Sequence, residues 1–113
     1  MNENPSSFLF KTIFDLLPQP IILLKKNKLK IEYCNLEIQN LLGKSNESLK
    51  GNLLEDIFTK DPILIANISE IIKKNGVFLI KDKIKLKDSF FEINCIISEE
   101  LNNNFFIILN KVP

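Results

Sequence analysis

Residues 31–58 read IEYCNLEIQNLLGKSNESLKGNLLEDIF, and this stretch decides the fold. It begins as an alternating strand, after which Asn35 supplies a side chain that favours the N-cap of a helix. Gly43 stands where a helix end needs a left-handed residue, and Gly51 interrupts the following turn. The stretch therefore predicts a strand followed by short helices, with a last apolar stripe formed by Leu53, Leu54, Ile57 and Phe58.

The preceding residues predict one helix and a hairpin. Four apolar residues with the spacing i, i+3, i+4 and i+7 mark one face of a helix: Phe10, Ile13, Phe14 and Leu17. The helix ends before two prolines. Residues 21–24 and 29–33 then read as two strands around a polar, lysine-rich turn.

The residues after the quoted stretch predict a longer helix and three strands. Asp61-Pro62 is a helix start signal and Asn75-Gly76 ends that helix. The strands cover residues 77–87, 91–97 and 105–109. Because residues 21–24 and 105–109 are apolar on both sides, both faces of the sheet should be covered. We expect an α+β fold with a five-stranded antiparallel sheet, short helices inserted after strand 2 and an N-terminal capping helix.

Composition excludes several kinds of site. The 113 residues include no histidine and no arginine, and the formal net charge is +1. The chain therefore lacks the usual general base and haem ligand, and two cysteines alone do not form a zinc site. We expect no catalytic residues, no metal and no nucleic-acid partner, because nucleic-acid binding requires a clustered basic face.

Two further features bear on the compartment. No signal-peptide pattern opens the sequence, and no apolar run approaches the ~18 residues of a membrane span. We expect a cytoplasmic protein without membrane contact, in which Cys34 and Cys95 are reduced core thiols. A redox-sensing thiol would instead need exposure and a lowered pKa.

The quoted stretch resembles the centre of a PAS domain, the small sensor module of bacterial signalling proteins. The family pattern is "y.N.a...llG.s...l.G..l.dif", and the matching residues are Tyr33, Asn35, Ile38, Leu41, Leu42, Gly43, Ser48, Leu49, Gly51, Leu53, Asp56, Ile57 and Phe58. The resemblance extends over residues 15–112. It implies that residues 18–113 form the PAS core, and that residues 1–17 form a lead and a capping helix that dimerises.

Residues 16–23, LLPQPIIL, are most similar to the N-terminal sensor domain of nitrogen-regulation (NtrB-type) sensor histidine kinases. Such kinases respond to a PII-type signalling protein and phosphorylate a response regulator. The resemblance thus implies a sensory and dimerisation module of a two-component system, with its kinase region beyond Pro113 or on another chain. A free-standing PAS module for protein interaction or small-ligand binding is the alternative, and an enzyme is a more distant one.

In this family a ligand lies between the sheet and the inserted helices. The residues expected to face that space are apolar except for the tip of Tyr33, which describes a filled core better than a ligand cage. We expect no tightly bound cofactor, with haem and flavin disfavoured and an unidentified small apolar ligand left open. The pocket candidates are Ile22, Leu24, Tyr33, Ile38, Leu42, Leu53, Ile57, Ile71, Phe91 and Ile93.

The family's N-terminal helix packs on the outer face of the sheet and often pairs with its twin. Together with the strands that are apolar on both sides, this implies a homodimer with the interface candidates Phe10, Ile13, Phe14, Leu17, Phe106 and Ile108. Residues expected to hold turns and caps are Asn35, Gly43, Gly51 and Gly76. Where many PAS domains end in Asp-Ile-Thr, this chain reads Asn110-Lys111-Val112, which keeps an acceptor but loses the charge.

Overall fold

The computed structural model describes residues 5–58 and 62–113, apart from the side chains of residues 5–8, 81 and 82. The helices and strands follow one another in the order expected, with two additional short 3-10 helices, η1 and η2. Their bounds are α1 Pro5–Leu16, β1 Ile21–Lys25, η1 Asn27–Leu29, β2 Lys30–Cys34, α2 Leu36–Leu42, α3 Asn46–Leu49, α4 Leu54–Ile57, α5 Pro62–Ile71, β3 Gly76–Leu86, β4 Ser89–Ile97, η2 Glu99–Leu101 and β5 Asn104–Lys111.

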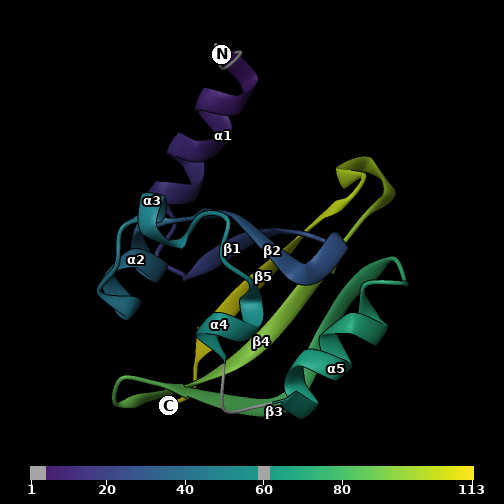
Figure 1. The fold of residues 1–113 in the computed structure, drawn as a ribbon. Coiled ribbons are helices and arrows are strands. Elements are labelled where there is room, and N and C mark those ends of the chain that lie inside the picture. Colours follow the sequence, from purple (N-terminus) through teal and green to yellow (C-terminus); the bar gives the residue numbers. More distant parts are fainter. Residues whose placement is uncertain (1–4, 59–61) are drawn as a thin grey trace.

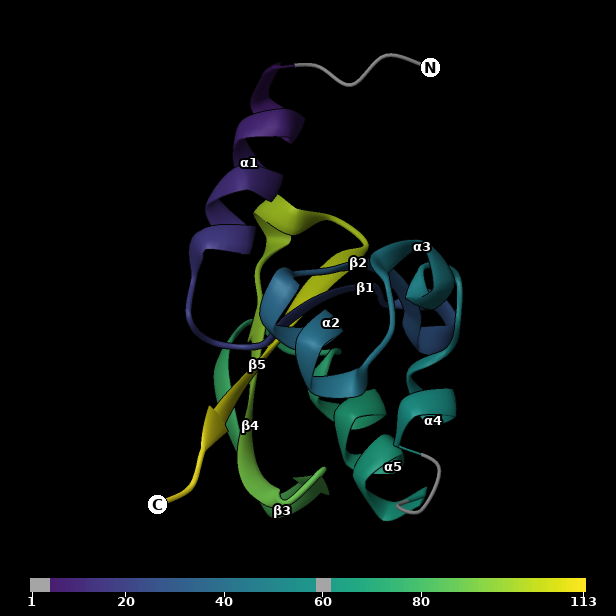
Figure 2. The same ribbon diagram turned by 90° about the vertical axis from the view of Figure 1, so that its left-hand side faces the viewer.

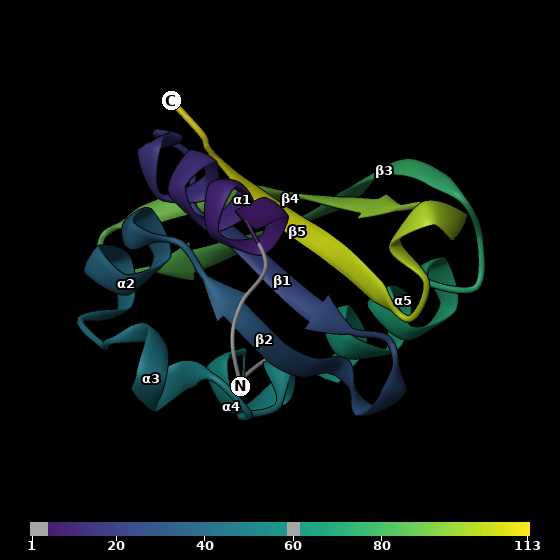
Figure 3. The ribbon, with the colours of Figure 1, turned by 90° about the horizontal axis from the view of Figure 1, so that it is seen from above.

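The strands form one antiparallel sheet in the order β2-β1-β5-β4-β3. The inserted helices α2 to α5 cover one face, which we call the inner face, and α1 lies on the opposite, outer face (Figures 1 and 2). Seen from above, α1 crosses over β1 and β5 (Figure 3). This arrangement confirms the predicted α+β fold, in which an antiparallel sheet carries helices. Within the described ranges, no helix is long and apolar enough to cross a membrane.

The core fills the space between the inner face and the inserted helices. The central strands contribute fully buried side chains such as Ile22, Ile93 and Ile107, and the helices contribute Ile38 and Ile68. The helix predicted from Asp61-Pro62 begins at Pro62, while Asp61 itself lies outside the described residues. Burial of this apolar surface is the main favourable contribution to folding.

Asn35 is a fully buried polar residue, and its side-chain amide makes four hydrogen bonds. Its Oδ1 accepts from the backbone N–H of Ile21 at 3.0 Å and of Ile38 at 3.2 Å. Its Nδ2 donates to the carbonyls of Phe14 at 2.9 Å and Gln19 at 2.8 Å. The predicted N-cap of α2 is confirmed, and the same amide also joins the end of α1 and the start of β1.

The predicted turn residues also have the expected conformations. Gly43 ends α2 in the left-handed region, with φ 67°. Gly51 and Gly76 have φ 88° and 131°, in a region that side chains with a Cβ rarely adopt. These three glycines therefore allow the chain to turn after α2, after α3 and at the start of β3.

A β-bulge in β2 reverses the direction of one side chain relative to expectation. Leu23 pairs with Tyr33, whereas Leu24 pairs with Ile31, so Glu32 is an extra residue in β2. Ile31 consequently faces the core, but Tyr33 faces the outer side of the sheet and α1. The prediction that Tyr33 points towards a ligand space is therefore wrong, because strict alternation does not survive the bulge.

Both cysteines are fully buried in the core and remain free thiols. Burial disfavours the thiolate, and it raises the pKa of Cys34 and of Cys95 from 9.0 to about 12. A raised pKa opposes reactivity, since the thiolate is the nucleophile. Their placement fits the expected structural role.

Replacing Asn35 by alanine should lower the free energy of unfolding by about 2–4 kcal/mol, because two buried N–H groups and two carbonyls each lose the hydrogen bond that they make with the amide. Urea unfolding followed by circular dichroism measures this change. The matched control is Asn67→Ala, at an exposed position of α5, which should change stability by less than about 0.5 kcal/mol. Equal effects of the two substitutions would show that the Asn35 amide is not a structural link.

Cys34 and Cys95 should react with a thiol reagent such as DTNB at pH 8 only as fast as the protein unfolds. The cause is burial, which keeps both protonated until the pH approaches 12. Since unfolded thiols ionise first, stability should also fall as the pH rises from about 9 towards 12. An added exposed thiol, Lys74→Cys, provides the positive control. Prompt labelling of either native cysteine would contradict this picture.

Candidate functional site

The N-terminal helix is held on the outer face by an aromatic cluster. The ring of Phe106 on β5 lies 5.6 Å from that of Phe10 and 4.9 Å from that of Phe14, measured between centroids. The rings of Phe10 and Phe14 are themselves 4.2 Å apart. Because such ring pairs contribute beyond their buried area, the cluster fixes α1 over the centre of the sheet.

Polar contacts fix the rest of the helix. The hydroxyl of Tyr33 on β2 donates to Oδ1 of Asp15 at 2.7 Å. The ammonium of Lys11 lies 5.7 Å from the centroid of the Tyr33 ring, within range of a cation–π interaction. Together with the bond from Asn35 to the Phe14 carbonyl, these contacts tie α1 to β2 and to the N-cap of α2.

The structure divides the predicted dimer residues into two groups. Phe10, Phe14 and Phe106 contact one another within the chain, so the aromatic half of the predicted surface faces inward. Ile13 and Leu17 are exposed, and Ile108 is half-buried on the outer face.

A second apolar stripe on α1 shares only Ile13 with the predicted interface, which did not include Leu9 or Leu16. Leu9, Ile13 and Leu16 are 59, 49 and 78% exposed and follow the spacing i, i+4 and i+7. We call these three residues the α1 stripe. The signal was present in the sequence, but a helix with apolar residues around most of its circumference does not reveal which stripe meets the sheet.

The outer face remains apolar towards the edge strand β3. Val77 and Leu79 are 68 and 57% exposed. Val77 pairs with Ile96, which in turn pairs with Phe106, so these side chains share the outer face. Two exposed apolar surfaces, the α1 stripe and this edge, thus lie on the same side of the molecule.

The predicted ligand-pocket residues mostly form packed core. Five of them are buried: Ile22, Leu24, Ile38, Phe91 and Ile93. Three more are partly buried and pack against this core: Leu42, Ile57 and Ile71. Leu53 lines a pocket of about 310 Å³ beside η1, α4 and α5. Tyr33, as described above, faces α1.

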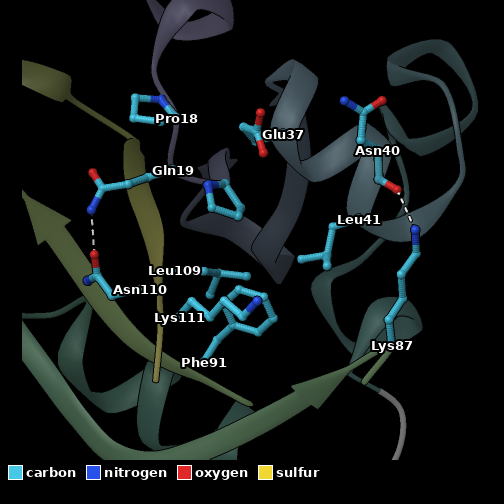
Figure 4. A pocket seen from close by; sticks show the side chains of 11 residues that line it. Pro18, Gln19, Glu37, Asn40, Leu41, Lys87, Phe91, Leu109, Asn110 and Lys111 are labelled. Atoms are coloured by element: carbon cyan, nitrogen blue, oxygen red, sulfur yellow. Dashed lines mark hydrogen bonds between the residues drawn. The ribbon is translucent and has the colours of Figure 1, made fainter. Parts of the chain in front are cut away.

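A larger pocket, of about 440 Å³, opens beside α2 at the end of the sheet (Figure 4). Of the predicted pocket residues, Phe91 lines it. The walls of this pocket come from the residues before β1, from α2, from the β3–β4 turn with the start of β4, and from the end of β5. No local pattern indicates that these segments meet.

The last residues of β5 contact the segment that leads from α1 into β1. The backbone N–H of Leu109 donates to the Pro20 carbonyl at 2.9 Å, and the Gln19 amide donates to Oδ1 of Asn110 (Figure 4). Val112 N–H donates to the Phe90 carbonyl at 2.8 Å. Asn110 stands where many PAS domains have aspartate. Its side-chain oxygen accepts a hydrogen bond from Gln19, a residue from the beginning of the chain.

Several solved structures have this fold at low sequence identity. The PAS domain of an HTR-like protein from Haloarcula marismortui matches with a TM-score of 0.72 at 14% identity, covering 95% of this chain and 97% of that one. The Rhodobacter sphaeroides LOV protein has a TM-score of 0.75 at 9% identity, with coverages of 97% and 69%. A sensory box sensor histidine kinase from Vibrio cholerae has a TM-score of 0.63 at 13% identity, covering 95% of this chain and 91% of that one.

Sequence comparison gives a second, independent result. Among curated proteins, no sequence matches the chain at a significant level. A family model described as "PAS domain" matches residues 9–82, which include most of α1, the bulged β2 and all the inserted helices. The chain belongs to the PAS domain family.

Proposed function

We propose that the chain is the sensory and dimerisation module of a two-component sensor histidine kinase of the nitrogen-regulation (NtrB) type. It carries no catalytic residues of its own and passes a signal to a C-terminal kinase region. The similarity of residues 16–23 to such kinases supports the type, and a PII-type signalling protein is the corresponding partner. The module acts in the cytoplasm.

The observation that carries dimerisation is the α1 stripe. Leu9, Ile13 and Leu16 project away from the aromatic cluster that docks the helix, so α1 can contact the sheet and a second copy at once. A helix that presents apolar residues at i, i+4 and i+7 is suited to pairing with its twin. Val77 and Leu79 extend the apolar surface on the same side.

The route of the signal follows from the contacts at the end of β5. A change in how α1 packs on its twin alters the position of the segment after α1, where Gln19 binds Asn110. The residues after β5 would shift with it. Asn110 in this way replaces the charged residue that many PAS domains use at this position.

We further propose that the module works without a tightly bound cofactor. Most of the residues expected to hold a ligand pack against one another on the inner face, and both cysteines are buried with raised pKa values. The signal therefore arrives through protein contact or through a weakly held small molecule. A free-standing PAS module, without a kinase, is the second candidate and uses the same surfaces.

The reading frame after codon 113 distinguishes the two candidates. A kinase module predicts a following helix with the motif His-Glu-x-x-x-Pro and, further on, a glycine-rich ATP lid. Sequencing of the gene beyond this point is the measurement. A stop codon, or an unrelated domain, would favour the free-standing module.

The double substitution Ile13→Asp/Leu16→Asp should convert a dimer into a monomer, raising the dissociation constant by at least about tenfold, because the carboxylates would be desolvated in the interface. Light scattering coupled to gel filtration across a micromolar range gives the mass. Phe14→Asp is a poorer test, since Phe14 packs within the chain and its loss would disturb folding.

Ile63→Asp provides the matched control, because Ile63 is 68% exposed on α5, which covers the inner rather than the outer face. It should leave the dimer unchanged. A monomeric wild-type protein would overturn the proposal, as would a doubly substituted protein that still forms the dimer.

A further inference from the structure

The pocket of about 440 Å³ at the end of the sheet has the size of a small-molecule site. Its apolar wall is formed by Leu41, Phe91 and Leu109, the last two of which are buried. Figure 4 shows charged and amide side chains around this wall, which come from the segment before β1, from α2, from the β3–β4 turn and from the end of β5. An apolar wall with a few polar groups at its rim is the usual composition of a ligand pocket.

Two hydrogen bonds span the rim. On one side the Lys87 ammonium donates to the Asn40 carbonyl at 2.8 Å, and on the other Gln19 donates to Asn110 (Figure 4). Lys87 has φ 54°, a left-handed conformation that favours glycine, so the turn holds a strained residue whose ammonium reaches the pocket. The Lys87 ammonium retains two further N–H donors after this bond.

The charges around the pocket have both signs. Glu37 is a half-buried carboxylate on α2, whereas Lys87 and Lys111 are cations. Within the part of the chain that the structure describes, none of the three forms an ion pair with another side chain. Glu37 would repel a simple anion, and the two lysines would repel a simple cation. A molecule that carries both charges satisfies all three groups.

We propose that this pocket binds a small zwitterion with an apolar body, of the class of the hydrophobic α-amino acids. Its ammonium pairs with Glu37 and its carboxylate with Lys87 and Lys111, while its side chain packs on Phe91 and Leu109. Such a ligand contacts both the segment that follows α1 and the last residues of β5. The site does not depend on the proposed function, since a free-standing module would bind the same molecule.

Isothermal titration of the full chain with three probes tests this assignment. L-Phenylalanine should bind more tightly than 3-phenylpropionate, which lacks the ammonium, and than 2-phenylethylamine, which lacks the carboxylate, by about tenfold each. Glu37→Gln should weaken the binding of L-phenylalanine by about tenfold and should leave the binding of 3-phenylpropionate unchanged or make it tighter. Lys111→Gln should weaken the binding of the two probes that carry a carboxylate, L-phenylalanine and 3-phenylpropionate. It should leave the binding of 2-phenylethylamine unchanged.

The matched control is Lys74→Gln, an exposed lysine in the segment that connects α5 to β3, away from the pocket. It should bind all three probes like the wild type, and thermal melts confirm that each variant is folded. Absence of saturable L-phenylalanine binding at millimolar concentration would overturn the proposal. Binding that is unchanged in both Glu37→Gln and Lys111→Gln would overturn it too, because the ligand would then occupy another place.

Discussion

The fold depends on one buried amide. The Asn35 side chain satisfies four backbone groups that belong to the end of α1, the residues before β1, the first residue of β1 and the first turn of α2. Without it the N–H groups of Ile21 and Ile38 would lose a buried hydrogen bond, and the Phe14 carbonyl would keep only its bond from the Leu17 N–H. Because all four bonds come from one rigid planar group, the N-terminal helix, the sheet and the inserted helices have a common fixed point.

This fixed point explains how α1 can serve two surfaces. The amide of Asn35 holds the C-terminal end of the helix, and the cluster around Phe106 holds its middle. With one face committed to the sheet, the α1 stripe is presented outward at a defined angle. An undocked helix of 12 residues would be only marginally stable in water. Docking on the sheet therefore stabilises the helix, and the α1 stripe exists as a continuous surface only while the helix is formed.

Local cues in the sequence were sufficient for most of the fold. The caps at Asn35 and Gly43 depend on neighbouring residues, and hydrophobic periodicity located the helices and the strands that have one buried side, while residues 21–24 and 105–109 were recognised as short apolar runs. The family resemblance then supplied the layer order. The direction of Tyr33 was predicted wrongly because it depends on the register of β2. The extra residue Glu32 turns Tyr33 to the outer face, and no nearby residue signals that bulge.

The functional surfaces were harder to predict for a related reason. The helix stripe chosen from periodicity included Phe10 and Phe14, which proved to be the docked side. Only the tertiary partner Phe106, almost a hundred residues away in the chain, determines which apolar stripe remains free. The pocket beside α2 likewise arises where four distant segments meet, as the Gln19–Asn110 contact shows.

The pairing of β1 with β5 also has a mechanical consequence. Ile21 at the start of β1 lies opposite Ile108 near the end of β5, so the chain enters and leaves this ladder at the same end. Ladder bonds in an antiparallel pair run perpendicular to the strands. Tension between α1 and the residues after β5 would therefore open the pair one bond at a time rather than load all bonds together. Such peeling needs little force, so the two flanking segments can be separated without unfolding the rest of the sheet first.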